Sequence, residues 1–285
     1  ENFKCIQSID IPLSPLTAFV GPNDSGKTTV LKAVQIGATG EMELSRELAR
    51  AFPDFDLTPA PASPEALPTI TLWQEPLEGD SSPELHWERK IKIEVEKDDH
   101  GIELLQTIVK GDGPSVSTLF YSPQPDLLKR PSDSPRKLHA LPSKLTRLLG
   151  EARETFFEIE DRLREWVPTI SSILLKRGGL DEKMDLLWFE LTSGERVPSV
   201  TMSDGALLLL EYLTLVLASP RPKILLIDGP EEGIHPRALE KLINFFRSVQ
   251  SEDPELQILM ASHSPDLLSF LEPEEIVVTY RQEKG

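Results

Sequence analysis

The sequence predicts an α/β fold in which a mostly parallel sheet is flanked by helices, with an antiparallel β portion and an inserted helical lid or arm. Three observations support this prediction. Strand-like and helical segments alternate near both ends of the chain, the middle holds runs with apolar residues at alternate positions, and a long amphipathic helical pattern follows them. Alternating strands and helices are typical of a parallel sheet with helices packed on it.

The N-terminal part predicts strand, loop and helix. From Phe3 to about Gln35, two short runs with alternating apolar residues precede an apolar strand at 16–20, a glycine-bearing loop and a helix. Prolines between 53 and 68 stand among Ala, Ser and Asp, so we expect an exposed irregular insertion there. Strands resume at 69–73 and at 85–95, the second with its apolar residues on one face.

The middle of the chain predicts a lid or arm. Prolines between 123 and 142 indicate a loop, after which Ser143 is placed to cap one long helix. Apolar residues recur mostly at spacings of three and four as far as Trp166, which favours an amphipathic helix. A hairpin and the start of a further helix are expected next, at 186–191, at 197–200 and near Ser203.

The C-terminal part is the most regular. Apolar strands alternate with helical patterns, which predicts parallel strands covered by helices. The expected strands are 224–227, 258–261 and 276–280, and the expected helices are 238–249 and 265–271.

Composition indicates a soluble globular protein. The chain has 285 residues, 39% of them apolar and 27% charged. The longest apolar run, 206–218, is interrupted by Glu211, so it predicts a buried helix rather than a membrane span. No targeting peptide is visible at Glu1, and the single cysteine, Cys5, excludes an internal disulfide and fits a reducing compartment. We therefore expect a cytoplasmic protein.

The charge of the chain bears on its partners. A formal net charge of −17 argues against a broadly basic nucleic-acid surface, because binding to phosphates needs clustered Lys and Arg. A local basic groove stays compatible with this composition.

The first chemical motif is a phosphate-binding loop. Residues 21–28 read GPNDSGKT and fit G-x-x-x-x-G-K-[ST], between an apolar strand and an apolar helix. Glycines let the backbone wrap a phosphate, whose charge the loop N–H groups and the helix N-terminus attract. Lys27 is placed to reach the β and γ phosphates and Thr28 to bind Mg²⁺. The alternative, a chance glycine turn, is disfavoured by the strand and helix on either side.

Two further motifs follow apolar strands. KILLIDGPEEGIHP, residues 223–236, carries Asp228 at a strand end, where an α/β sheet presents ligands to a bound nucleotide, so we expect Asp228 to hold magnesium. LMASHSPD, residues 259–266, places His263 where an imidazole could contact the γ phosphate or a nearby water. A helix cap at Ser264 with a surface histidine is the structural alternative, and both readings can hold.

The fourth motif is TMSDGALLLLEYL, residues 201–213. Ser203 and Gly205 precede a strongly apolar helix, whose N-terminus is suited to an anion. From the residues alone, an ordinary N-cap at Ser203 is the better interpretation.

In this order the four motifs resemble the ABC-type ATPase heads related to RecF, SMC and the overcoming-lysogenization-defect (OLD) family, especially small bacterial OLD-like AAA family ATPases. The resemblance is strongest in residues 2–35 and 198–280. It implies a P-loop NTPase fold of ABC-ATPase type, with ATP and Mg²⁺ as cofactors. It also implies a head-to-tail homodimer with two ATP molecules between the subunits.

The resemblance assigns roles to individual residues. It implies Walker B at Asp228, a switch histidine at His263, and contacts in trans from Ser203 and Gly205 to the other subunit's γ phosphate. The stretch around His235 resembles a loop that crosses the dimer interface, and Gln74 is a weak candidate for a magnesium-sensing glutamine. The Walker A residues are Gly21, Pro22, Asn23, Asp24, Ser25, Gly26, Lys27, Thr28 and Thr29.

One position departs from the pattern. The resembling motif usually reads D-E-P-E, with the first Glu as the base for the attacking water, whereas this chain has Gly229 there. Glycine can do no proton chemistry, which leaves hydrolysis undecided. Glu231 and Glu232 follow on the same turn. Either could substitute for the base, but solvated surface carboxylates are the better interpretation of both from the residues alone; of the two, Glu231 is the candidate catalytic carboxylate.

We expect one ATPase head over 1–285, with three lobes. These are 1–120 with Walker A and the antiparallel portion, 121–182 as the lid or arm, and 183–285 with the signature, Walker B and switch histidine. The leading function is an ATP-driven switch that gates a partner protein or effector nuclease, in DNA processing or antiviral defence. The alternative is a non-hydrolysing, nucleotide-gated scaffold for a protein partner.

Overall fold

The structure is a computed structural model. It describes residues 11, 13–39, 69–74, 87–97, 103–110, 117–132, 140–178 and 183–280, with the backbone alone for 69–74, 87–97, 103–110 and residues 36, 37 and 39. The expected insertion at 53–68 and the first strand-like runs before residue 11 lie outside the described residues.

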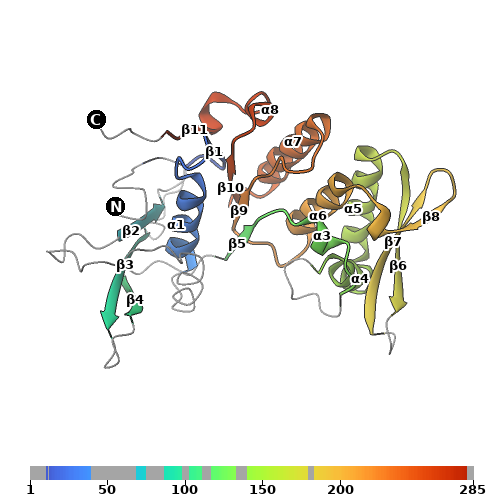
Figure 1. Cartoon of the computed structure of the whole chain (residues 1–285), viewed down its shortest axis with the longest axis horizontal. Helices are drawn as coiled ribbons and strands as arrows, with labels where there is room; N and C mark the ends of the chain where they lie inside the picture. Colours follow the sequence, from blue (N-terminus) through green and yellow to red (C-terminus); the bar gives the residue numbers. More distant parts are fainter. Residues whose placement is uncertain are drawn as a thin grey trace.

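A five-stranded parallel sheet forms the centre of the protein (Figure 1). Its strand order is β11-β1-β10-β9-β5, so strands far apart in sequence lie side by side, and all neighbouring pairs run parallel. The mostly parallel sheet expected from the sequence is confirmed. The strands are β1 (Leu16–Val20), β5 (Thr118–Tyr121), β9 (Ile224–Asp228), β10 (Gln257–Ser262) and β11 (Ile276–Val278).

Helices cover the sheet on both faces because its strands are apolar on both sides. One face, which includes Phe19, Leu226 and Leu259, packs on α1 (Lys27–Thr39) through Val30 and Leu31. The other face belongs to the larger core, with α6 (Asp204–Leu217) and α7 (Pro236–Glu252). A parallel sheet buried in this way needs no polar outer face, which is why its strands are mostly apolar instead of alternating between apolar and polar residues.

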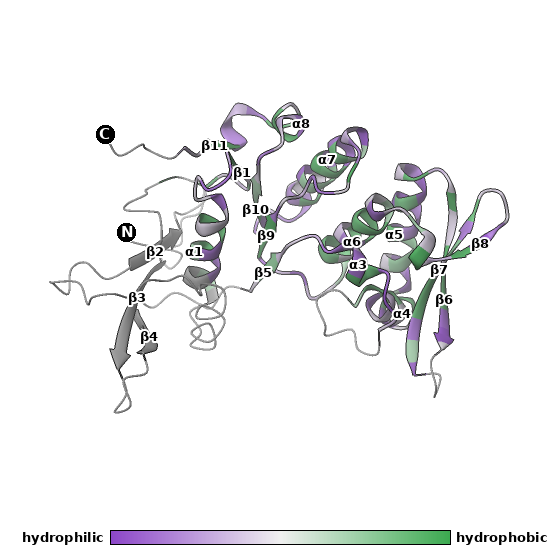
Figure 2. Cartoon of the chain, viewed as in Figure 1, coloured by the Kyte–Doolittle hydropathy of each residue, from purple (hydrophilic) through white to green (hydrophobic). Residues whose placement is uncertain are grey.

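Helix α6 is strongly apolar, and hydrophobic colour is visible along it in Figure 2. Every residue from Ala206 to Val216 is buried, including Glu211. It packs against α3 (Pro125–Leu128), α4 (Leu141–Glu151) and α5 (Arg153–Trp166). Helix α6 therefore connects the core of the parallel sheet with helices α3, α4 and α5.

Two antiparallel sheets complete the fold. The first has the order β2-β3-β4 and the second the order β6-β7-β8. Strands β4, β5 and β6 were not predicted from the sequence. The strands are β2 (Thr69–Gln74), β3 (Trp87–Lys97), β4 (Glu103–Lys110), β6 (Ile170–Gly178), β7 (Met184–Leu191) and β8 (Arg196–Pro198).

The prediction of one long helix capped by Ser143 is wrong. The helical segment is split at Ala152 into α4 and α5, and the N-cap of α4 is Ala140. Ser143 lies inside the first turn of α4, where its hydroxyl donates to Asp185 Oδ2 at 2.7 Å and accepts from Ser132 Oγ at 2.8 Å. A serine with buried side-chain partners does not need the cap position, so its role is to tie α4 to β7.

The remaining elements are short. They are the 3₁₀ turns η3 (Ser199–Thr201) and η4 (Pro273–Glu275) and the helix α8 (Pro265–Leu268). Helix α8 and strand β11 are both shorter than their patterns predicted. Among the residues that the structure describes, none of the helices has both the length and the apolar character that a membrane span requires.

Candidate functional site

Three strand ends bring the predicted motifs to one edge of the parallel sheet. Val20, at the end of β1, pairs with Ser262 at the end of β10, and Ala261 pairs with Asp228 at the end of β9. Since parallel strands in register end together, the loops after Val20, Asp228 and Ser262 leave the sheet side by side. The sequence predicted this convergence from three separate motifs.

The loop after β1 has the backbone of a phosphate cradle. Asp24 has φ 62° and Gly26 has φ 96°, both in the left-handed region, so the chain wraps before α1 begins at Lys27. The first helical hydrogen bond runs from Val30 N to Gly26 O at 3.0 Å. The N-terminus of α1 therefore points its first N–H groups and positive dipole end into the loop, as anion binding requires.

Lys27 is folded back into the cradle. Its Nζ donates to Gly21 O at 2.9 Å and to Pro22 O at 2.7 Å, and the residue is only 9% exposed. The ammonium group is thus held where a phosphate of a bound nucleotide would lie against the loop. A phosphate oxygen is a stronger acceptor for an ammonium group than a carbonyl oxygen. Hydrogen bonds from Lys27 Nζ to phosphate oxygens can therefore replace those to Gly21 O and Pro22 O.

A C-terminal residue that the sequence did not single out anchors the loop. Ser25 Oγ lies 2.7 Å from Thr279 Oγ1, and Thr279 N donates to Val20 O at 2.8 Å. Thr279 directly follows β11, which pairs with β1. No local pattern could identify it, because the contact joins residues 254 positions apart and depends on the strand order.

Thr28 and Asp228 are brought together as predicted. Thr28 Oγ1 lies 3.1 Å from Asp228 Oδ1 and 3.0 Å from Oδ2, across two different strand ends. A hydroxyl and a carboxylate are hard oxygen ligands, and Mg²⁺ is usually held by one or two carboxylates together with substrate phosphates. These residues therefore fit Mg²⁺, which would neutralise phosphate charge there.

Burial raises the pKa of Asp228, and the hydrogen bond from Thr28 and the charges of Lys32 and Lys27 oppose part of that rise. A bound divalent cation would lower the pKa of Asp228 further, because it favours the ionised carboxylate. The carboxylate is thus half-buried in a position where a cation stabilises it.

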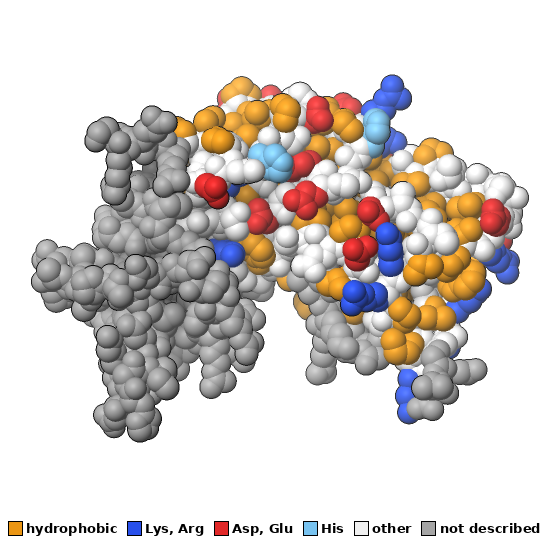
Figure 3. Space-filling model, viewed as in Figure 1, with side chains coloured by type: hydrophobic (Ala, Val, Ile, Leu, Met, Phe, Trp, Pro, Cys, Tyr) orange, Lys and Arg blue, Asp and Glu red, His pale blue; other side chains and the backbone are white. Residues whose placement is uncertain are grey.

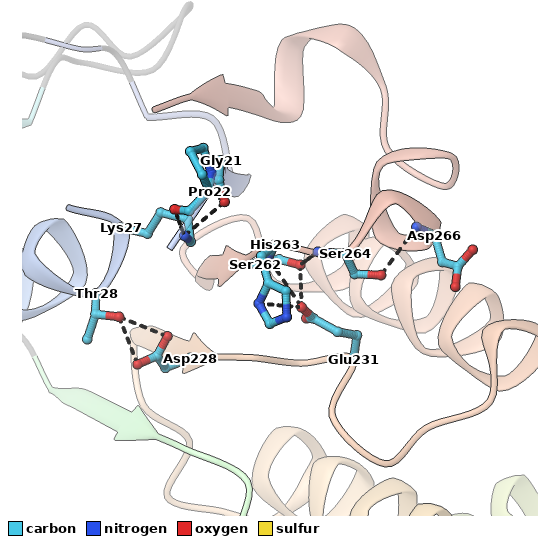
Figure 4. A network of polar contacts seen from close by, with 10 residues as sticks. All are labelled: Gly21, Pro22, Lys27, Thr28, Asp228, Glu231, Ser262, His263, Ser264 and Asp266. Carbon is cyan, nitrogen blue, oxygen red and sulfur yellow. Dashed lines mark hydrogen bonds and ion pairs between the residues drawn. The ribbon is translucent and has the colours of Figure 1, made fainter. Parts of the chain in front are cut away.

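Glu231 and His263 meet across the loops after β9 and β10 (Figure 4). Glu231 Oε1 accepts from Ser262 Oγ at 2.6 Å and from the His263 backbone N at 3.3 Å, and it lies 3.8 Å from His263 Nδ1. The Glu231 side chain is only 11% exposed, and its Oε2 atom has no hydrogen-bond partner within the described part of the chain. Glu231 therefore holds the His263 loop in place and is not a solvated surface group.

Gly229, directly after Asp228, has a backbone conformation in the left-handed region, which glycine adopts without strain. Gly229 has φ 78°, and its carbonyl accepts from Glu232 N at 3.1 Å, which closes a turn over residues 229–232. Glu232, at the end of this turn, is exposed, and its pKa is raised by partial burial and by the charges of Glu231 and Asp228. The turn thus gathers three carboxylates at one strand end.

Ser203 has the structural role that was the better of its two predicted readings. Its hydroxyl accepts from Ala206 N at 3.4 Å as the N-cap of α6, so the structural reading is confirmed, yet the residue is exposed. Gly205, on the first turn of α6, lies against the loop after β9. A Cβ on Gly205 would come within 2.7 Å of Gly233 O. The backbone of the first turn of α6 and that of the loop after β9 therefore lie close together.

Two weaker assignments have different outcomes. His235 caps α7, since its Nδ1 accepts from Arg237 N at 3.3 Å, and this gives it a structural role that the sequence did not assign. Gln74 is the last residue of β2, but its side chain lies outside the described residues.

Acidic side chains gather on the central part of the face seen in Figure 3, in keeping with the net charge of −17.

Comparison with known proteins agrees with the fold and the motifs. The family described as "AAA ATPase domain" matches residues 1–102. The OLD nuclease of Thermus scotoductus is 45% identical over 62 residues, which are 21% of this chain and 12% of that nuclease. The chain thus aligns with only a small part of this relative's length.

Solved SMC heads share the fold. One is the Smc head domain from Pyrococcus furiosus, with an extended coiled coil and bound to the C-terminal domain of ScpA. It has a TM-score of 0.62 and 11% identity, covering 99% of this chain and 92% of that one. Another SMC head, bound to the C-winged helix domain of ScpA, has a TM-score of 0.59 and 14% identity, covering 95% and 89% of the two chains. At these identities the likeness establishes the fold alone.

The remaining match covers most of the sequence. The family described as "AAA domain, putative AbiEii toxin, Type IV TA system" matches residues 74–269, more than half of the chain. That range includes the Asp228 and His263 motifs, while residues 1–102 with the phosphate-binding loop match the second AAA family. The chain is an ATPase domain of the AAA type with a phosphate-binding loop, and it belongs to the family described as "AAA domain, putative AbiEii toxin, Type IV TA system".

Proposed function

We propose that this ATPase domain is a nucleotide-operated switch: it binds ATP with Mg²⁺, closes on a second copy of itself, and in closing controls a partner protein. The observation that carries the proposal is the convergence of Lys27, Thr28 and Asp228 at the ends of β1 and β9. These are the groups that a nucleotide triphosphate and its metal need. Lys27 Nζ, which donates to Gly21 O and Pro22 O, would exchange these hydrogen bonds for contacts with the phosphates.

Closure on a second copy is supported by the surface around Ser203. The Ser203 side chain is exposed at the N-terminus of α6, and the nearby Val200 is 60% exposed. An exposed hydroxyl at a helix N-terminus binds an anion, and an apolar neighbour favours contact with another protein surface. In the proposal, this surface meets the γ phosphate held by the other chain's Lys27.

The class of partner follows from charge and from similarity. The net charge of −17 suits a basic protein partner better than DNA. Similarity to part of an OLD nuclease supports an effector nuclease as the activity controlled, in DNA processing or antiviral defence. The SMC heads similar in fold were solved with bound ScpA domains, which makes a protein partner a reasonable choice.

The experiment compares two variants that fail for different reasons. Lys27→Ala removes the phosphate contact. Ser203→Asp keeps a good N-cap for α6 but places a negative charge opposite the γ phosphate. Sedimentation velocity with saturating MgATP should give a dimer for the wild type and monomers for each variant alone, while Ser203→Asp still binds ATP.

Mixing the two variants tests the geometry in trans. A mixed dimer has one intact site, made of Lys27 from one chain and Ser203 from the other, so mixing should restore dimer formation. A wild type that stays monomeric with MgATP, or a mixture that stays monomeric, contradicts the proposal.

A second candidate, a nucleotide-gated scaffold that does not hydrolyse ATP, is favoured by Gly229 alone. It predicts tight MgATP binding and closure with no phosphate release. Phosphate release from the wild-type protein in a single-turnover assay would exclude it.

A further inference from the structure

The space that the Cβ atom of a side chain at residue 229 would take is occupied by Glu232. A Cβ built on Gly229 would lie 2.8 Å from Glu232 Oε1, 3.0 Å from its Cδ and 3.1 Å from its Cγ. The carboxyl group of Glu232 thus fills the space that the first atoms of a side chain at residue 229 would take. Since 2.8 Å is shorter than real Cβ contacts, a side chain at residue 229 would require the Glu232 carboxyl group to move from its present position.

The turn explains how Glu232 reaches this place. The Gly229 N–H donates to Ala261 O at 2.9 Å, which fixes residue 229 against β10. The hydrogen bond from Glu232 N to Gly229 O then turns the chain back over residue 229. The left-handed φ of Gly229 makes this turn available without strain, which is a second reason for glycine at this position.

Of the two glutamates on the turn, Glu232 has the accessible carboxylate. Glu231 is largely buried, and its Oε1 atom is engaged with Ser262 and the His263 backbone. Glu232 is exposed and lies within electrostatic reach of Asp228 and His263. A general base must contact the water that it activates, which favours the open carboxylate over the enclosed one.

We propose that Glu232 is the catalytic base of this ATPase and takes the role of the glutamate whose usual position is held here by Gly229. In this proposal Glu231 is a positioning residue for His263. This rests on the proposed ATP-binding function and names the residue that makes it hydrolytic. It replaces the sequence-based choice of Glu231 as the catalytic carboxylate.

The reaction balances without a further reactant. The Glu232 carboxylate takes a proton from water while the water oxygen bonds to the γ phosphorus of ATP. The bond between that phosphorus and the oxygen bridging to the β phosphate breaks, and its electron pair leaves with ADP. The proton on Glu232 then passes to solvent, which regenerates the carboxylate.

The test separates binding from chemistry. In the full chain, Glu232→Gln should slow single-turnover ATP hydrolysis by about 100-fold or more, the usual size of a general-base contribution. The Kd for MgATP and the MgATP-dependent dimer should stay within about threefold of wild type, since amide and carboxyl groups have the same shape. Glu240→Gln, the same change at an exposed position on α7, is the matched control and should leave both quantities unchanged.

A second variant tests the link to residue 229. Gly229→Ala should displace the Glu232 carboxyl group and slow hydrolysis, but it should add little in a chain that already carries Glu232→Gln. Equal slowing in both backgrounds would mean that Gly229 acts independently of Glu232 and would overturn the inference.

Two other results also overturn it: hydrolysis at the wild-type rate by Glu232→Gln, or a wild-type protein that binds MgATP and dimerises without hydrolysing it. Neither result touches the proposed binding and closure, which the dimer assay reports separately.

Discussion

The Lys144 ammonium group lies 2.9 Å from Glu211 Oε1 and joins α4 to α6, the helix that Ser203 caps. Glu211 is completely buried in α6, and the Lys144 side chain on α4 is 16% exposed. A buried carboxylate without a cation beside it is costly, so this pair fixes how α4 sits on α6.

Removing the cation should therefore destabilise the protein strongly. We expect Lys144→Met to lower the free energy of unfolding by about 3–5 kcal/mol, the usual cost of leaving one buried partner uncompensated. Lys223→Met, which removes a half-exposed lysine paired with Glu255, should cost less than about 1 kcal/mol. Urea unfolding measures both, and similar losses in the two variants would contradict a special role for the buried pair.

Stability should also depend on pH through Glu211. Burial raises the pKa of Glu211, and Lys144 opposes part of the rise. Between the usual glutamate value of about 4.3 and the raised pKa, the unfolded chain has lost a proton that the folded chain keeps, so stability falls as pH rises.

The comparison is with Glu211→Gln, which lacks this group. The unfolding free energy of the wild type minus that of the variant should be largest below about pH 4.3, decrease as pH rises, and become constant above the raised pKa. A difference that grows with pH would show that the ion pair outweighs burial.

The contact between Gly205 and Gly233 predicts a local steric effect. In Gly205→Ala, the new Cβ would meet Gly233 O, a backbone atom that cannot turn aside, so we expect a loss of about 1–3 kcal/mol in unfolding free energy. Because Gly233 belongs to the loop after β9, MgATP-dependent dimer formation should weaken as well.

Gly150→Ala is the matched control. Gly150 lies in α4 with nothing within 4 Å of a built Cβ, so alanine should be neutral or stabilising by up to about 1 kcal/mol. Equal effects of the two alanines would exclude a specific contact at Gly205.

Thr28→Val should weaken the binding of ATP with Mg²⁺ much more than the binding of ATP without it. Valine has the shape of threonine but no hydroxyl, so the contact with Asp228 and the expected Mg²⁺ ligand are both lost. Calorimetry should show ATP affinity falling about tenfold or more with Mg²⁺ and little with EDTA, since an interaction with a charged group is worth about 1.5–3 kcal/mol. Thr214→Val, a threonine bonded within α6, should change neither affinity.

The parts of the fold that the sequence predicted well are those where periodicity and end signals agree. The strands that precede the loops at Gly21, Gly229 and His263 are runs of mostly apolar residues, and the ends of all three lie within a residue of their predicted positions. The N-cap at Ser203 was also identified correctly, because Ser precedes a long apolar helix.

The parts that it missed depend on tertiary contacts. Strand β5 is four residues beside a proline-rich stretch, and only its pairing with β9 makes it a strand. The break at Ala152 does not interrupt the apolar spacing, so periodicity alone joined α4 to α5. The position of the Glu232 carboxyl group beside Gly229 comes from a turn whose direction depends on the φ angle of Gly229. The amino-acid sequence alone does not specify that angle.

The hydrogen bond between Ser25 and Thr279 has a consequence for how the protein is made. A ribosome releases the phosphate-binding loop early, whereas Thr279 emerges more than 250 residues later. Until then β1 lacks its neighbours β10 and β11, and the loop lacks its anchor. A nascent chain therefore has no finished cradle, and ATP capture during synthesis should begin only after β11 has left the exit tunnel.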